Sequence, residues 1–210
     1  MPNGQDPRVF TYLTLRKSVG VIAFALPFAV AIPIFIARHV LESSISGYYY
    51  TGARNLFVGS LCAVAMFQFS CRGFDWRDEV AGIFSAICSV GVGFFPTAPE
   101  IGASPQQKHI GWVHYTFAAL LFLTLAYFCL VLFKIRSETP TPQKLQRNGV
   151  YTASGVVILL SLLAIAVTRG WDLKYSILGL GPVLFFETTS LLAFGTAWLT
   201  KGETILKDVS

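Results

Sequence analysis

Long apolar runs alternate with short polar segments along the whole chain. Six of these runs are close to the roughly 20 residues that a helix needs to cross the hydrocarbon core of a bilayer. They lie at residues 18–37, 52–70, 79–95, 112–133, 149–168 and 177–198, with boundaries defined to about 2–4 residues. This pattern predicts an all-α, polytopic transmembrane helix bundle in which residues 1–210 form a single domain with six spans.

Composition supports that fold class and excludes an ordinary soluble domain. Of the 210 residues, 54% are hydrophobic and only 13% are charged. In a soluble domain about a quarter of the residues are charged. The charges gather between the apolar runs, and they leave a net charge of +5. A nucleic-acid partner is not needed to explain this net positive charge, because anionic membrane lipids attract basic residues near the membrane surface.

The distribution of Lys and Arg predicts the orientation, since cytoplasmic loops of membrane proteins carry the excess of positive charge. Segments on the side of the two termini hold most of the 16 Lys and Arg residues: Arg8, Arg16, Lys17, Arg72, Arg77, Lys134, Arg136, Lys144, Arg147, Lys201 and Lys207. The opposite side holds the rest: Arg38, Arg54, Lys108, Arg169 and Lys174. Both termini are therefore predicted to be cytoplasmic.

Tryptophan and small residues refine this arrangement. Trp prefers the two membrane interfaces, and all four Trp residues fall at predicted span boundaries: Trp112 and Trp171 on the outside, Trp76 and Trp198 on the inside. In the third run, Ser85, Ser89 and Gly93 recur at four-residue spacing and form one small-residue face. Because such a face lets helices approach closely, we expect the third helix at the centre of the bundle.

The first outer loop, SISGYYYTGARNLF at 44–57, contains three consecutive tyrosines followed by an arginine. Interfacial anchoring accounts for one or two of these rings. Successive helical positions are about 100° apart, so at least one of Tyr48, Tyr49 and Tyr50 should point into the bundle. Arg54 has two interpretations: it reaches back to the interface, or it faces inward toward an anionic headgroup or Glu187.

Glu187 is the one acidic residue predicted deep within a span. It lies ten residues into the sixth run, which places it near the bilayer midplane at a rise of about 1.5 Å per residue. An intramembrane carboxyl group is costly and marks a functional hypothesis, although a structural hydrogen bond explains it equally well. The candidate polar partners of Glu187 are Arg54, His114, and either Thr188 or Ser190.

The three histidines all fall on the predicted extracytoplasmic side. His39, His109 and His114 could form a zinc site with an open fourth position, the arrangement that activates water. On one continuous helix His109 and His114 would lie about 140° apart, so this site requires His109 to remain in the loop. The other interpretation is that they are hydrogen-bonded interfacial histidines, in which case no cofactor is expected.

Several short motifs together resemble a prokaryotic six-helix membrane protein family of unknown function, similar in layout to the DRAM/FRAG/Sfk group of eukaryotic proteins. These motifs are SIS in the first outer loop, LFVG in the second run, GFFP at the end of the third, and HYTFAALLF in the fourth. The resemblance implies six helices with cytoplasmic termini in a prokaryotic cytoplasmic membrane. It points to Ser44, Ser46, Phe95, Pro96 and His114 as family-like positions.

Members of the eukaryotic group are linked to lipid remodelling or membrane trafficking, so the resemblance implies lipid handling. Relatives of the DRAM type tend to carry an acid where this chain has Arg54 and Asn55, which would change any headgroup preference. A weaker similarity is to the membrane hydrolase superfamily of alkaline ceramidases and progestin-receptor-like proteins. This chain lacks the intramembrane aspartate and the paired histidines on a last helix that those proteins use.

The sequence therefore favours an integral membrane protein with a polar pocket that opens to the extracytoplasmic face and binds a lipid or other amphiphile. The candidate ligand-binding residues are Ser44, Ser46, Tyr48, Tyr49, Tyr50, Arg54, Trp112, His114 and Glu187. One alternative is a zinc-dependent hydrolase of a lipid amide or ester, with His39, His109 and His114 as metal ligands. Another is an accessory subunit of a membrane complex, and a homo-oligomer is equally open.

Overall fold

Helices make up nearly all of the computed structural model, which describes residues 7–70, 75–135, 141–173 and 175–206. In this part of the chain the α-helices are α1 (Pro7–Arg38), α2 (Arg54–Ser70), α3 (Trp76–Phe94), α4 (Pro105–Leu130), α5 (Pro142–Gly170) and α6 (Pro182–Lys201). A 3-10 helix, η1 (Ser46–Tyr50), lies between α1 and α2, and a second, η2 (Leu132–Lys134), follows α4. The all-α prediction is confirmed.

Four described segments are long and apolar enough to cross a membrane: Leu13–Arg38, Pro105–Lys134, Pro142–Gly170 and Pro182–Lys201. The other two helices are short, with 17 residues in α2 and 19 in α3. At a rise of 1.5 Å per residue they span about 26–29 Å, just under the roughly 30 Å of a hydrocarbon core. Arg72, Arg136, Lys174 and Lys207, which contribute to the predicted charge balance, lie outside the described residues.

The helix that carries Glu187 begins later than predicted. The chain from Ile177 to Leu180 forms a tight turn, in which these two residues exchange backbone hydrogen bonds of 3.0 and 2.9 Å. Gly179 has a φ of +79°, a conformation that glycine adopts without strain. Pro182 then occupies the first turn of α6, where its missing N–H costs nothing. The predicted start of the sixth span at 177 was therefore too early.

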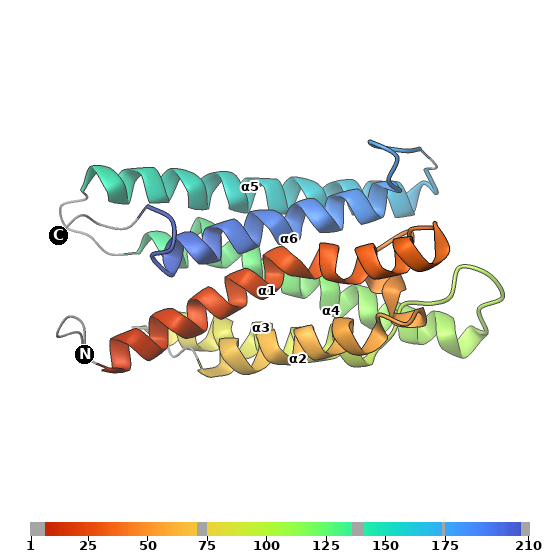
Figure 1. Ribbon diagram of the computed structural model, residues 1–210, viewed down its shortest axis with the longest axis horizontal. Coiled ribbons are helices and arrows are strands. Elements are labelled where there is room, and N and C mark those ends of the chain that lie inside the picture. The colour runs from red at the N-terminus through yellow and green to blue at the C-terminus, as the bar shows by residue number, and fades with distance from the viewer. Residues whose placement is uncertain (1–6, 71–74, 136–140, 174, 207–210) are drawn as a thin grey trace.

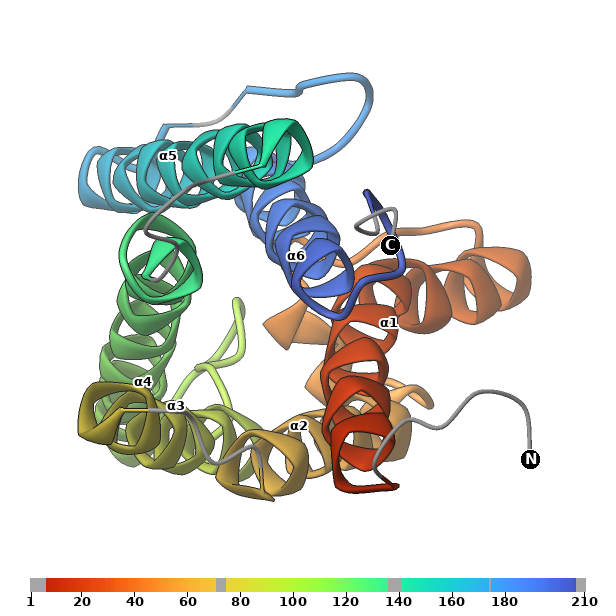
Figure 2. The same cartoon turned by 90° about the vertical axis from the view of Figure 1, so that its left-hand side faces the viewer.

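The six helices form a closed ring in chain order. Each helix packs on the next one along the chain, and α6 returns to pack on α1, as the end-on view in Figure 2 shows. Consecutive helices run in opposite directions, so both ends of the chain lie at one end of the ring, here called the terminal end (Figure 1). The opposite end carries η1 and is called the η1 end.

The expectation that the third helix occupies the centre of the bundle was wrong. In the described chain α3 is one member of the ring and packs mainly on α2 and α4. Its small-residue face serves these contacts: Ser85 and Ser89 are fully buried. A Cβ atom on Gly93 would lie 3.6 Å from the side chain of Leu61 on α2. The small residues therefore set close packing within the ring without placing α3 at its centre.

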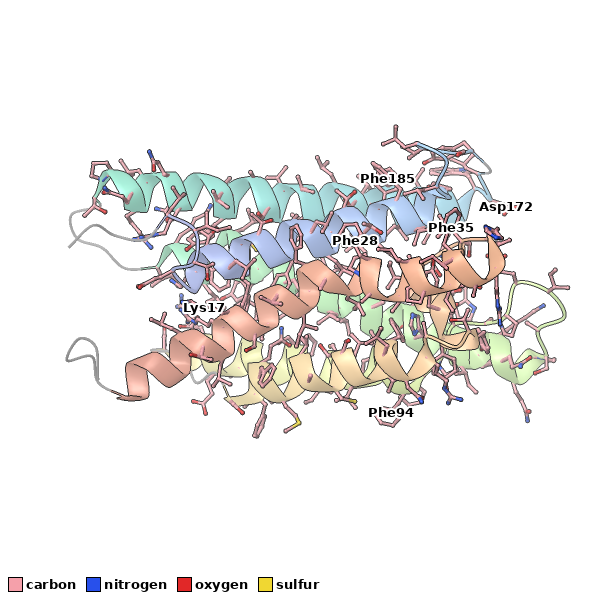
Figure 3. The ribbon with its side chains drawn as sticks, viewed as in Figure 1. Lys17, Phe28, Phe35, Phe94, Asp172 and Phe185 are labelled. Carbon is pink, nitrogen blue, oxygen red and sulfur yellow. The ribbon has the colours of Figure 1, made fainter. Side chains whose placement is uncertain are left out.

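The outer surface of the ring carries many exposed apolar side chains. Phe28, Phe35 and Phe94 project outward and are 45%, 48% and 62% exposed. Charged groups such as Lys17 and Asp172 lie toward the two ends in Figure 3. An apolar surface of this extent is typical of a protein that contacts lipid.

Three of the four tryptophans are exposed as expected of interfacial residues, and the fourth is not. Trp76, Trp112 and Trp171 are 68–71% exposed, but Trp198 is 3% exposed. The interfacial prediction for Trp198 was wrong because this face of α6 points into the ring. There the indole packs at centroid distances of 4.9–5.1 Å against three aromatic rings: Phe128, Phe133 and Phe194.

Candidate functional site

The loop between α1 and α2 is tied to two distant helices by polar contacts at the η1 end. The backbone N–H of Ile45 donates to Oε2 of Glu187 on α6, with a distance of 2.6 Å. Ser46 Oγ lies 2.9 Å from Nε2 of His114 on α4. These bonds connect positions 142 and 68 residues apart in the chain. The loop therefore closes this end of the ring from the inside.

The hydrogen-bond partners of His114 determine which of its ring nitrogens carries the proton. The side chain is 2% exposed, and Nδ1 lies 2.7 Å from the carbonyl oxygen of Phe95. Because a carbonyl only accepts, Nδ1 must carry the proton. In the neutral imidazole Nε2 then accepts, so the Ser46 hydroxyl donates to it. Both ring nitrogens are thus satisfied within the protein.

A serine that donates to a histidine is also the first requirement of a nucleophile with its general base. Acyl transfer further needs donors aimed at the developing oxyanion, usually backbone N–H groups beside the nucleophile. Here the neighbouring N–H groups of Ile45 and Gly47 already donate to side-chain oxygens. The N–H groups on either side of Ser46 are therefore not free to stabilise an oxyanion.

Glu187 lies near the η1 end and not at mid-depth. It is the sixth residue of α6, about 8 Å along the helix from Pro182. The turn at 177–180 delays the start of the helix, so Glu187 lies nearer to the start of α6 than the sequence had suggested. Its observed partner is the Ile45 backbone, which none of the candidates named from the sequence had included.

A cavity of about 490 Å³ lies between α4 and α5 at the η1 end. Its volume is in the range of sites for small molecules and cofactors. Its polar or amphipathic lining residues are Ser46, Trp112, His114, Tyr115, Arg169 and Glu187. The rest of the lining is mainly apolar and comes from the two helices: Ala118, Ala119, Phe122, Leu162, Ile165 and Ala166. One cavity thus joins a polar end to an apolar wall, which matches the two parts of an amphiphile.

Arg169 and Tyr115 link this cavity to the surrounding loops. Nη1 of Arg169 donates to the Tyr115 hydroxyl at 3.1 Å, and the guanidinium lies 4.7 Å from the centre of the Tyr115 ring. The same hydroxyl is 2.9 Å from Oγ1 of Thr97, whose carbonyl accepts from the Tyr50 hydroxyl at 2.6 Å. This network joins η1, the loop before α4, α4 itself and the end of α5.

The three tyrosines of η1 separate as expected, with one ring inside the bundle. Tyr48 is fully buried, and burial raises the pKa of its hydroxyl, so the phenol stays neutral. Tyr49 and Tyr50 pack edge to face at 5.3 Å. The Arg54 guanidinium lies 4.3 Å from the Tyr49 ring centre and donates to its hydroxyl. Arg54 is exposed and does not contact Glu187, so it follows the interface interpretation.

The histidines named for the zinc alternative occupy different environments. His39 is exposed, packs edge-on against Phe35, and has a φ of 55°. His109 is exposed on α4 with Nδ1 2.9 Å from the carbonyl of Pro105. Within the described ranges, no three His, Cys, Asp or Glu side chains are grouped as metal ligands. The loop position that the zinc site required for His109 is not observed, because His109 and His114 lie on the same helix, α4. A zinc-dependent activity is otherwise untested and stays a prediction.

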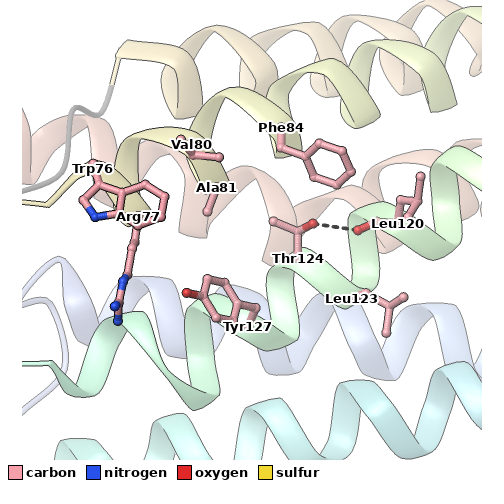
Figure 4. Close-up of a pocket in the computed structure, with 9 residues that line it drawn as sticks. All are labelled: Trp76, Arg77, Val80, Ala81, Phe84, Leu120, Leu123, Thr124 and Tyr127. Atoms are coloured by element: carbon pink, nitrogen blue, oxygen red, sulfur yellow. Dashed lines mark hydrogen bonds between the residues drawn. The ribbon is translucent and has the colours of Figure 1, made fainter.

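Two other hollows have different linings. A cavity of about 580 Å³ between the ends of α5 and α6 shares Arg169 and also contains Glu100 and Asp172. Figure 4 shows a groove of about 380 Å³ on the outer face between α3 and α4. The groove has apolar walls with Trp76 and Arg77 at one end, and it contains no acid or histidine. Neither hollow brings together residues that the sequence had singled out as a site.

Four of the nine predicted ligand-binding residues line the cavity between α4 and α5: Ser46, Trp112, His114 and Glu187. The other five do not line it: Ser44, Tyr48, Tyr49, Tyr50 and Arg54. Sequence reasoning missed Tyr115 and Arg169. The adjacency of Tyr115 to His114 was a usable signal, but the spatial approach of α5 to α4 was not visible in the sequence.

The comparisons with known proteins leave the fold and the cavity as the basis for any inference about function. The chain matches no protein-family model, no curated protein and no solved structure. The family resemblance drawn from the motifs therefore remains a prediction.

Proposed function

We propose that this protein is an integral membrane protein that binds a lipid or another amphiphile in the cavity between α4 and α5. The observation that carries this proposal is the division of a single cavity into a polar end and an apolar wall. Ser46, His114 and Glu187 lie at the polar end, where the side-chain oxygens of Ser46 and Glu187 would accept hydrogen bonds from a headgroup. The apolar side chains of α4 and α5 would pack against the hydrocarbon chain.

The proposed setting is a prokaryotic cytoplasmic membrane, with six spans and both termini on the cytoplasmic side. The described basic residues support this orientation because more of them belong to the terminal half of the ring, which includes Arg16 and Lys17 on α1 and Arg77 at the start of α3. The short helices α2 and α3 would cross with slight thinning of the bilayer around them. The η1 end and its cavity would then face the extracytoplasmic side.

A substitution that fills the cavity tests the proposal. Ala166 lies on α5 and lines the cavity, so Ala166→Trp should occupy the space of the ligand and weaken binding about tenfold. Ala153 is also an exposed alanine on α5, away from the cavity lining, so Ala153→Trp is the matched control. The measurement is the phospholipid that remains per protein after purification in mild detergent. Equal lipid in the two variants and the wild type would contradict the proposal.

A further inference from the structure

Two opposite charges line the cavity between α4 and α5 from different helices. Glu187 comes from α6, and Arg169 comes from the last turn of α5. Their direct partners are other groups, since Glu187 accepts from the Ile45 backbone and Arg169 donates to Tyr115. The cavity thus holds a cationic and an anionic group that a single ligand could bridge.

Both groups retain hydrogen-bonding capacity for a ligand. A guanidinium has five N–H donors, and the bond to Tyr115 occupies one of them. A carboxylate has about four acceptor positions, and the backbone N–H groups of Ile45 and Ser46 take up to two of them. Hydrogen bonds between charged partners are about twice as strong as those between neutral ones, and more so away from water. A ligand with complementary charges would therefore be held at two points.

We infer that the cavity selects a zwitterionic amphiphile that carries a primary ammonium group and a phosphate, as in the ethanolamine phospholipids. This inference rests on the proposed function. The ammonium would lie against Glu187, and the phosphate would lie against Arg169 at the end of α5. The acyl chain would follow the apolar wall formed by Ala118, Ala119 and Leu162.

The contacts of Tyr115 favour a primary over a quaternary ammonium. Aromatic rings attract quaternary ammonium groups, and Tyr115 and Trp112 both line the cavity. The Arg169 guanidinium already covers the Tyr115 ring at 4.7 Å, so a second cation there would meet a like charge. Glu187 offers hydrogen-bond acceptors, which a primary ammonium uses and a trimethylammonium group cannot. The cavity therefore distinguishes ethanolamine from choline through Glu187.

Both charged groups lie in the half of the bundle that includes the η1 end. Glu187 is the sixth residue of α6, and Arg169 is next to the last residue of α5, so both lie near the η1 end. Trp112, also on the cavity lining, is 71% exposed and marks the level at which tryptophan meets the membrane interface. A phospholipid that enters between α4 and α5 would bring its headgroup to this level without leaving the bilayer.

The experiment titrates delipidated protein with phospholipids of identical acyl chains in which the ethanolamine nitrogen carries no, one, two or three methyl groups. Binding is followed by native mass spectrometry. The wild type should bind the unmethylated lipid about tenfold more tightly than the trimethylated one, with a progressive loss between them. Glu187→Gln keeps an oxygen for the Ile45 N–H, and it should remove this discrimination while binding persists.

Two further variants test the phosphate contact of Arg169 and provide a control for it. Arg169→Gln should weaken binding of all four lipids alike, because every one of them carries the phosphate. Arg54→Gln, an exposed arginine at the same end, should leave all affinities unchanged. Equal wild-type affinity for all four lipids, or tighter binding of an anionic phosphatidylglycerol, would overturn the selectivity and leave the proposed function standing. No binding of any phospholipid would overturn both.

Discussion

The two ends of the helix ring accommodate buried polar groups in different ways. At the terminal end, the ammonium groups of Lys201 and Lys144 both donate to the carbonyl of Phe133, at 3.1 and 3.3 Å. Aromatic side chains fill the adjacent interior and leave a space of only about 20 Å³. At the η1 end, Glu187 and Arg169 face a cavity of about 490 Å³.

The difference indicates that the two ends of the bundle have different roles. The ammonium groups of Lys144 and Lys201 at the terminal end are bonded to the backbone, and the rings around Trp198 form a packed core that stabilises the fold. Polar groups at the η1 end are held in place by the loop before α2, but they leave space open between helices. We therefore expect substitutions at the terminal end to change stability, and substitutions at the η1 end to change lipid binding.

The largest stability effect is expected from Trp198→Ala. This residue is 3% exposed, and truncation of a buried aromatic side chain typically costs about 3–5 kcal/mol. Trp112→Ala is the matched control at the other end, where the ring is 71% exposed, and it should cost about 1 kcal/mol or less. The measurement is the free energy of unfolding in a titration with denaturing detergent. Similar losses from both substitutions would remove the distinction between the ends.

An intermediate effect is expected from His114→Ala, which leaves the Phe95 carbonyl and the Ser46 hydroxyl without their partner. Each buried group left unpaired costs about 1–3 kcal/mol, and the lost bond between helix and loop should also reduce lipid binding. A double-mutant cycle with Ser46→Ala isolates the contact itself, for which about 0.6 kcal/mol is the average in a membrane protein. A coupling energy of zero would mean that the Ser46–His114 hydrogen bond contributes nothing.

The smallest effect is expected from Arg54→Gln. The guanidinium stacks on Tyr49 at an exposed position, where such a contact is worth about 0.5–1 kcal/mol. Because Arg54 does not line the cavity, its substitution should leave the amount of bound lipid unchanged. A loss of lipid comparable to that of Ala166→Trp would place the ligand at the outer side of η1 and not between α4 and α5.

The fold was largely predictable because apolar runs of bilayer length leave little choice but helices. Errors arose where local turn chemistry mattered, as at the turn before Pro182, which shifted Glu187 toward the η1 end. Trp198 was misassigned because the interfacial preference of tryptophan says nothing about which face of a helix points inward. Its spacing of four residues from Phe194 was the available signal for a buried face.

The candidate site was predictable only in part. Histidine and glutamate stood out because polar residues are rare in apolar runs, and both line the cavity. Arg169 did not stand out, since an arginine at the end of a span is expected at an interface. Its role depends on the approach of α5 to α4, a contact that apolar periodicity does not specify. Arg54 looked equally suitable in sequence but lies on the outer side of η1.

The most direct test of lipid binding between α4 and α5 is photo-crosslinking in nanodiscs, with an ethanolamine phospholipid that carries a photoreactive acyl chain. The peptides labelled on the wild type would be identified by mass spectrometry, with Ala166→Trp as the blocked control. The account predicts labels within 112–119 and 162–170, which contain much of the cavity lining, and their loss in Ala166→Trp. Labels confined to 76–84 and 123–127, the groove of Figure 4, would contradict it.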